Sequence, residues 1–358
     1  MKGGCAPTRP KAAARPVDFR GAADYPESMR MSPCRSTILL VALALAAGTA
    51  GCSFLRSVFG EDQGYLFSGY DTLALPGEEI EVKVRLQSGS FLRDKHGVPL
   101  RFQQDGRLLG AARTDDDGYA AVRFKPPAPG DYIVTAEAVP GSLKTASLSP
   151  VEALVSCREA GAPLVIVDLD KTLVAAGFRT VLVGDPPPMA HSVEVMNELA
   201  RRFTLVYLTH RLEYFGPKSR AWLHAHGYPR GPVILADVRE FLKGSGDYKT
   251  EVIERLRQRF RGRLIGIGDK ASDTRAYLAN GAEAFLLVRV PEDARAKDLR
   301  AVAHSLRSAP ANAQVVSDWR DVQQAVVEGT KYPKDRFVGN LLRRAAELEI
   351  MGRVPAGR

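Results

Sequence analysis

Apolar runs alternate with amphipathic stretches through the second half of the chain. At helical spacing, apolar positions predict helices over 192–202, 218–226 and 250–260. Unbroken apolar runs predict buried parallel strands over 164–168, 204–208, 232–236, 264–268 and 284–288. Because strands that alternate with helices are typical of a parallel sheet, we predict an α/β, Rossmann-like domain over 160–330.

A different pattern, of period two, precedes this region. Residues 80–86 alternate apolar with charged side chains, as a half-buried antiparallel strand does. Pro-Gly and Asp-Gly turns separate this stretch from three more short strands, predicted over 100–102, 119–124 and 132–136. Several short strands with regular turns predict an all-β sandwich over 63–150.

The N-terminal 52 residues have the pattern of a leader. Residues 1–28 are rich in Ala, Gly, Pro and Arg without apolar periodicity, which predicts disorder. Arg30 and Arg35 then precede an apolar run over 37–50, the pattern of a secretory signal peptide and too short for a comfortable membrane span. Signal peptides seldom begin so far before their apolar core, so we hypothesise a true start at Met29 or Met31. A peptide from residues 1–28 in mass spectra would contradict it.

Thr49-Ala50-Gly51-Cys52 resembles the bacterial lipobox, with Thr49 where Leu is usual. The resemblance implies lipidation of Cys52 and therefore a lipoprotein anchored to the membrane of the bacterial cell envelope. Ser53 after the cysteine implies sorting to the outer membrane, facing the periplasm, in a Gram-negative cell. The alternatives are an ordinary signal peptide cleaved near Ala50 and an uncleaved anchor.

Charge and cysteine content narrow the choice of partners. The net charge of +9 and the pI of about 9.4 favour anionic partners, such as phosphorylated substrates or an acidic membrane surface. No zinc finger, Arg-rich helix or aromatic ribonucleoprotein motif is present, so we predict no nucleic-acid partner. The four cysteines show no CxxC spacing, and neither a zinc site nor a redox pair is indicated.

Two aspartates, Asp168 and Asp170, follow the first predicted strand of the α/β domain. Ligands bind at the carboxyl ends of the strands in open parallel sheets. Two carboxylates there create a strongly negative pocket, which favours a cation, and hard oxygen ligands select Mg²⁺. The alternative is a strand that merely ends in an acidic turn.

Downstream residues decide between these alternatives. The motif Asp168-x-Asp170-x-Thr172 is followed in order by Thr209, Lys249 and the pair Asp269 and Asp273, each after the expected kind of element. This order resembles the haloacid dehalogenase (HAD) superfamily of phosphohydrolases, with its DxDxT, Thr or Ser, Lys and GDxxxD motifs.

The resemblance implies a role for each matching residue. Asp168 would be the nucleophile that forms an aspartyl-phosphate, and Asp170 the general acid and base. Thr209 and Lys249 would contact the phosphate, and Thr172 would brace the turn. Mg²⁺ would be held by Asp168, the backbone carbonyl of Asp170, Asp269 and, in or behind the first shell, Asp273.

Two neighbours of Thr209 have less certain roles. The guanidinium of Arg211 suits a bidentate phosphate contact. His210 fits local packing and function equally well. For the lysine role, Lys249 is preferred over other lysines because it opens the helix that leads to the fourth strand.

The segments 207–211, 218–237 and 248–250 look like the catalytic domains of lipins and of actin-patch phosphatidate phosphatases, over about 163–288. Lys171 departs from the Gly usual in lipins. The resemblance implies hydrolysis of phosphatidate or a similar lipid phosphate. Related domains of phosphatidylinositol-transfer proteins bind phosphatidate without hydrolysis because they lack the second Asp, whereas Asp170 is present here. A periplasmic acid phosphatase for soluble phosphomonoesters is the third alternative.

Only about 35 residues separate the first motif from Thr209, which leaves little room for a cap domain. We therefore predict a capless, open site, suited to a substrate presented at a membrane. After the α/β domain, residues 331–358 form a basic tail in which a helix over 335–350 packs on the domain or contacts a membrane surface.

Residues 114–124 and 129–136 resemble bacterial immunoglobulin-like (Ig-like) modules, and we assign this region no chemistry. Asp115, Asp116 and Asp117 fit either a calcium loop or, preferably, a solvated Asp-Gly hairpin turn.

Overall fold

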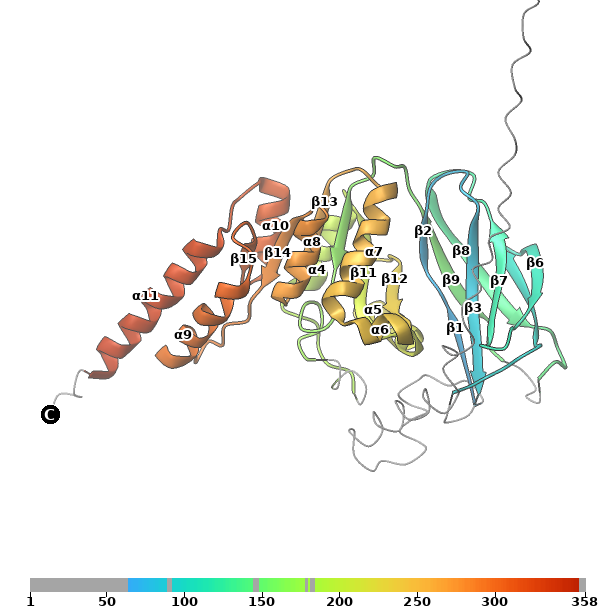
Figure 1. Ribbon diagram of the computed structural model, residues 1–358, viewed down its shortest axis with the longest axis horizontal. Coiled ribbons are helices and arrows are strands. Elements are labelled where there is room, and N and C mark those ends of the chain that lie inside the picture. Colours follow the sequence, from blue (N-terminus) through green and yellow to red (C-terminus); the bar gives the residue numbers. More distant parts are fainter. Residues whose placement is uncertain (1–63, 89–91, 144–147, 178–179, 181–183, 354–358) are drawn as a thin grey trace, which may run out of the picture.

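The computed structural model describes residues 64–88, 92–143, 148–177, 180 and 184–353. The leader and Cys52 lie outside these residues. Figure 1 shows three groups of elements: the blue and cyan strands, a central sheet flanked by helices, and a red pair of C-terminal helices. No helix in the described ranges combines the length and the hydropathy that crossing a bilayer requires.

The first nine strands form two sheets that pack face to face. Strands β1 (Tyr65–Gly69), β3 (Ile80–Ser88), β4 (Arg93–Asp94) and β7 (Tyr119–Phe124) form one sheet. The other has the order β2 (Thr72–Ala74), β9 (Val151–Cys157), β8 (Gly130–Ala138), β5 (Pro99–Gln104) and β6 (Arg107–Arg113). Alternate residues of both sheets fill the space between them, among them Val82, Val84, Leu100, Phe102 and Val134. The predicted sandwich is present.

Within the part of the chain that the structure describes, no group of acidic side chains placed to hold a metal ion includes the Asp-rich turn before β7. Asp115 Oδ1 accepts hydrogen bonds from the backbone N–H groups of Asp117 (3.0 Å) and Tyr119 (2.8 Å), and Gly118 has φ +77°. Asp115 therefore closes the turn on itself, as in an Asx turn. The geometry agrees with the solvated hairpin turn.

The central sheet is entirely parallel, as predicted. Its order is β12 (Val233–Ala236), β11 (Thr204–Leu212), β10 (Leu164–Val167), β13 (Leu264–Gly268), β14 (Glu283–Leu287) and β15 (Gln314–Val316). The strand that follows β10 in the chain, β11, pairs with one edge of β10, and the later strand β13 pairs with its other edge. This reversal of strand order opens a crevice at the carboxyl end of β10.

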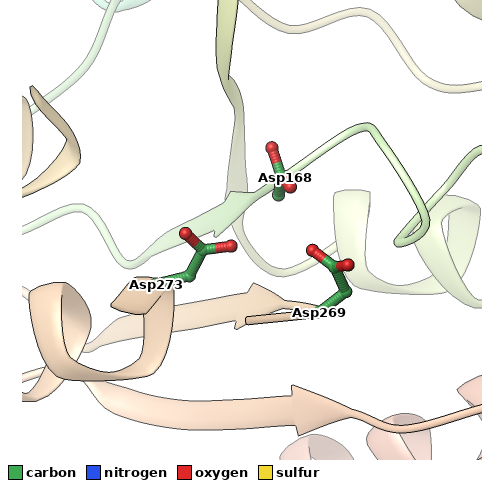
Figure 2. A group of neighbouring side chains, drawn as sticks. All are labelled: Asp168, Asp269 and Asp273. Carbon is green, nitrogen blue, oxygen red and sulfur yellow. The ribbon is translucent and has the colours of Figure 1, made fainter. Parts of the chain in front are cut away.

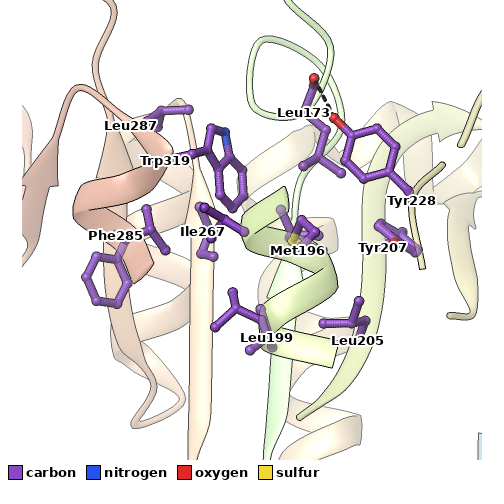
Figure 3. Packing of buried hydrophobic residues seen from close by; sticks show 14 of the residues in the cluster. Leu173, Met196, Leu199, Leu205, Tyr207, Tyr228, Ile267, Phe285, Leu287 and Trp319 are labelled. Atoms are coloured by element: carbon purple, nitrogen blue, oxygen red, sulfur yellow. Dashed lines mark hydrogen bonds between the residues drawn. The ribbon is translucent and has the colours of Figure 1, made fainter. Parts of the chain in front are cut away.

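Helices cover both faces because successive side chains of each strand point to opposite sides. Val165 and Val167 of β10 pack with α4 (Ser192–Ala200), α5 (Gly216–Ala225) and α10 (Trp319–Gln323), where Trp319, Met196 and Ile267 interlock (Figure 3). Leu164 and Ile166 face α7 (Ser245–Arg259) and α8 (Ala271–Ala279). The short elements η2 (Glu213–Phe215) and α6 (Val238–Lys243) follow β11 and β12.

The C-terminal helix packs on the α/β domain. Leu341 and Ala345 of α11 (Lys334–Arg353) are buried with Leu299 and Ala303 of α9 (Ala296–Ser305). Packing of the predicted helix is therefore present, while Leu342 and Ile350 are exposed on its other faces.

Asp71, in the loop between β1 and β2, joins the sandwich to the edge of the central sheet. Its carboxylate accepts from the backbone N–H of Leu154 on β9 and from that of Val233 on β12, each at 3.0 Å. The sandwich is thus tied to the central sheet through these two part-buried hydrogen bonds.

Candidate active site

Strand β10 delivers Asp168 to the crevice. Four fully buried apolar residues precede it, and its backbone N–H donates to the carbonyl of Ile267 on β13 at 3.0 Å. The side chain is only 3% exposed, which is costly for a charged carboxylate unless positive groups surround it. The groups around Asp168 therefore decide whether its carboxylate can be charged.

Three carboxylates converge at this point. Ligand oxygens of Asp168, Asp269 and Asp273 lie within 4.8 Å of one another, from the ends of β10 and β13 and the first turn of α8 (Figure 2). The approach of Asp273 requires glycine at position 268, because a Cβ there would lie 2.8 Å from Asp273 Oδ2. Three of the predicted metal ligands are brought together.

Lys249 supplies the opposing charge. It lies in the second turn of α7, rather than at its start as predicted, because the helix begins at Ser245. Its Nζ is 3.0 Å from Asp168 Oδ1 and 3.0 Å from Asp273 Oδ2, and the side chain is 1% exposed. Burial alone would lower the pKa of Lys249, but the two carboxylates raise it above its ordinary value. Lys249 is therefore a fixed cation.

The cluster can hold a metal ion. Lys249 pairs with two of the three carboxylates, and burial raises the pKa of the third, Asp269, with Lys270 and Lys249 opposing the rise. Among the described residues, the buried oxygens Asp269 Oδ1 and Asp273 Oδ1 receive no hydrogen bond. Unpaired buried oxygens of this kind suit a hard divalent cation such as Mg²⁺.

Asp170 lies outside this cluster and is paired with Arg211. Arg211 donates from Nε to Asp170 Oδ2 at 3.0 Å and from Nη2 to Oδ1 at 2.8 Å, while Nη1 donates to Ser219 Oγ on α5 at 2.9 Å. The bidentate partner of Arg211 is thus a carboxylate of the protein, where we had predicted a substrate phosphate. Strand β11 runs on to Leu212, four residues beyond its predicted end, which places Arg211 within the strand.

A cavity of about 330 Å³ opens beside these groups. Asp168, Asp170, Thr209 and Arg211 all line it, and Thr209 is 1% exposed. His210 also lines it and stacks on Phe241, with ring centroids 4.8 Å apart, which agrees with a packing role. Two of the three residues predicted to bind phosphate, Thr209 and Arg211, therefore share one cavity with the candidate nucleophile, whereas the third, Lys249, is buried behind Asp168 and does not line the cavity.

Thr172 is buried but does not brace the turn through its hydroxyl. Its Oγ1 has no hydrogen-bond partner among the described residues, whereas its backbone carbonyl accepts from Trp319 Nε1 at 3.0 Å. The turn is held by a tryptophan 147 residues further along the chain.

Lys171 and Ser245 also line the cavity and had not been singled out as site residues. Lys171 adopts φ +59°, the left-handed conformation that favours glycine. The departure from the lipin pattern thus falls at a backbone position suited to glycine. For Ser245, the sequence signal was the Gly-Ser-Gly run that begins α7, where Gly244 has φ +94°.

Lys171→Gly should stabilise the protein. A non-glycine residue in the left-handed conformation costs about 1–2 kcal/mol, and glycine removes this strain. Glycine also raises the conformational entropy of the unfolded chain, which offsets part of the benefit, so we expect the free energy of unfolding to increase by about 0.5–1 kcal/mol. Urea unfolding measures it. Lys171→Ala keeps the Cβ and is the control; an equal gain there would show that the long side chain, and not the backbone, is responsible.

The stability of the metal-free protein should fall as the pH rises from about 4 to 7. Burial raises the pKa of Asp168 to about 7, with Lys249 opposing the rise and Asp273 adding to it. An unfolded aspartate titrates near 3.9, so the folded state holds the proton more tightly. Its contribution is complete below pH 4 and is lost through pH 7. Urea unfolding in chelator tests this, and an unchanged slope in Asp168→Asn would contradict it.

The fold and the site together define a class, that of parallel α/β domains with an acidic centre and a buried lysine at the carboxyl ends of their strands. Residues 165–284, about a third of the chain, match the family model described as PITM 1-3, LNS2 domain. This family is of the lipin and PITM type and is related to HAD-like phosphatases, so a phosphatase or lipid-binding role is supported. A search of curated proteins finds no match.

Solved structures similar to the chain include β-rich modules at low identity. The fibronectin(III)-like modules of Clostridium thermocellum CbhA are 16% identical, with coverage of 25% of this chain and 88% of theirs and a TM-score of 0.18. The D00-D0 domain of intimin is 20% identical, with coverage of 27% and 49% and a TM-score of 0.21. The description of the two-sheet sandwich rests on its own strand pairing.

Proposed function

We propose that the α/β domain hydrolyses a phosphomonoester through an aspartyl-phosphate on Asp168. One observation carries the proposal: buried Lys249 holds Asp168 within a cluster of three carboxylates that opens onto a cavity. Packing alone gives no reason to bury so many charges at the end of one sheet, because buried charges are costly unless paired.

The reaction has two steps. The Asp168 oxygen that Lys249 does not hold attacks phosphorus, the bond to the ester oxygen breaks, and Asp170 gives the leaving alcohol its proton. Asp170 then takes a proton from water, the hydroxide attacks phosphorus, and the aspartyl-phosphate bond breaks to release phosphate. Thr209 and Lys249 stabilise the charge on the equatorial oxygens.

Asp168, Asp269 and Asp273 would hold Mg²⁺, which when bound supplies the positive charge that the phosphoryl group needs. In this proposal the backbone carbonyl of Asp170 would be a further ligand of the Mg²⁺ ion. Arg211 orients the Asp170 carboxylate through its two hydrogen bonds. Asp170 is thereby kept out of the carboxylate cluster.

The proposed substrate is phosphatidate or a similar lipid phosphate. The LNS2 match, the net charge of +9 and the predicted anchor at Cys52 support a basic enzyme that works on anionic lipid at the bacterial envelope. A soluble phosphomonoester of the periplasm is the alternative substrate.

A second candidate function is phosphatidate binding without turnover. The matched family supports lipid binding as well as hydrolysis, and the bidentate pair with Arg211 occupies both oxygens of the carboxylate that would move protons. In this case the cavity would bind a phosphate headgroup and release it unchanged.

Phosphate release by the chain from Ser53 onward separates these possibilities. Two substrates are compared: phosphatidate in vesicles, and a soluble aryl phosphate without vesicles. Each is assayed once with Mg²⁺ and once with chelator. Metal-dependent release from vesicles supports the lipid phosphatase, and release from the aryl phosphate alone supports a soluble substrate. Vesicle binding without release of phosphate from either would overturn hydrolysis in favour of binding.

A further inference from the structure

The β-sandwich reaches into the α/β domain beside the candidate active site. Arg85 of β3 is buried, and its Nη1 donates to the carboxylate of Glu213. Tyr119 of β7 donates its hydroxyl to the same Glu213 oxygen at 2.7 Å. Glu213 is 5% exposed and belongs to η2, which directly follows β11. Two residues of the first domain thus fix one residue of the second.

Glu213 lies two residues after Arg211, which holds both oxygens of Asp170. The peptide from Arg211 to Glu213 is the last part of β11 and the beginning of η2. Here the pairing of β11 with β12 is irregular, with a register shift between Leu208 and Leu212. The backbone that carries Arg211 therefore has less regular sheet pairing and depends on contacts beyond the sheet.

The sandwich side of this contact is rigid. Arg85 donates from Nη2 to Asp94 at 3.0 Å and from Nε to the carbonyl of Asp117 at 3.0 Å. Its guanidinium also lies over the ring of Tyr119, 4.6 Å from the centroid, and near that of Tyr214 at 5.3 Å. A buried arginine with this many partners has little freedom, so it offers Glu213 one fixed position.

We propose that Arg85 and Tyr119 are positioning residues for the active site: they hold Glu213, which sets the position of Arg211 and through it the carboxylate of Asp170. The Ig-like region, to which the sequence assigned no chemistry, is then part of the catalytic framework. This inference rests on the proposed phosphohydrolase function for its kinetic readout but not for its structural one.

The test compares two changes at opposite ends of β11 in the full chain. Glu213→Gln removes the charge that Arg85 and Tyr119 hold, just after the strand ends. Thr204→Val is the matched control: Thr204 begins the same strand and accepts a hydrogen bond from Arg158 of the sandwich side at 3.1 Å. Glu213→Gln weakens an interdomain polar contact by removing its charge and Thr204→Val removes one, but only Glu213 lies near Arg211 in the chain.

The kinetic readout is hydrolysis of whichever substrate the wild type turns over. We expect Glu213→Gln to lower kcat by about ten- to a hundredfold, the effect of a small displacement of a catalytic group, with KM changed by less than about twofold. Thr204→Val should keep kcat within about twofold of the wild type. Equal losses in the two variants would reduce the contact to general stability and overturn the proposal.

Hydrogen exchange gives a readout that does not need activity. In Glu213→Gln the amides of residues 209–212 should exchange more than about tenfold faster, while those of residues 264–268 on β13 keep their protection. Unchanged exchange at 209–212 would overturn the proposal even if the protein had no phosphatase activity. If Glu213→Gln does not fold, Tyr119→Phe takes its place, because it removes one hydrogen bond to Glu213. We expect the same loss of kcat and the same faster exchange at residues 209–212, each smaller than for Glu213→Gln, and the absence of both changes would overturn the proposal.

Discussion

Asp168→Asn should abolish phosphate release, by about 10⁴-fold or more, while leaving the protein folded. The amide cannot form the acyl-phosphate, and it lacks the charge that Lys249 and a metal ion would hold. In the metal-free protein the substitution also removes one of the two clustered carboxylates that share the ammonium of Lys249. We therefore expect its free energy of unfolding in chelator to be unchanged or higher near neutral pH.

Steady-state release of phosphate and urea unfolding, measured on the same preparation, check both parts. Asp116→Asn is the control, because that carboxylate is exposed on the turn before β7 and does not line the cavity. Residual turnover in Asp168→Asn above about a hundredth of the wild type would assign the nucleophile to another group.

Lys249→Met should destabilise the metal-free protein by about 3–5 kcal/mol. Removal of the ammonium leaves Asp168 and Asp273 buried without their shared cation, and burial of an unpaired charge is much more costly than loss of a surface contact. Turnover should be lost as well, because Lys249 contacts Asp168, the proposed nucleophile.

Urea unfolding in chelator, repeated with Mg²⁺, measures this effect. Because a bound cation would replace part of the missing positive charge, we expect Mg²⁺ to restore more stability to Lys249→Met than it adds to the wild type. The control is Lys243→Met, which removes an exposed ion pair with Glu251 and should change stability little. Equal stability of the two variants would mean that the carboxylates of the cluster are protonated and need no partner.

The core of the site was predictable because its signals are local. The apolar runs before Asp168 and Asp269 predict buried parallel strands, and parallel strands bring their carboxyl ends to the same edge. The central strands β10 and β13 lie close to their predicted bounds. Strand β11 extends beyond its predicted end, because the polar residues Thr209, His210 and Arg211 interrupt the apolar run from which its end was predicted.

The pairs that hold the site together depend on distant parts of the chain. Arg85 and Glu213 are 128 residues apart, and neither lies in a motif. Asp170 and Arg211 were both predicted as site residues, but the Asp170 carboxylate was expected to act as general acid and base and Arg211 to bind phosphate, rather than the two to pair with each other. Which side chains pair in this way depends on how whole domains pack together, and the periodicity of a single segment carries no information about it.

Asp71 has a consequence for how the protein avoids association with its own copies. Strand β12 is an edge of the central sheet, and an open edge presents backbone groups to which another chain can pair. The Asp71 carboxylate occupies the N–H of Val233 on that edge. A protein cleaved between β9 and β10 would uncover this strand, so the α/β domain alone is expected to aggregate through it, whereas the intact chain carries its own edge protection.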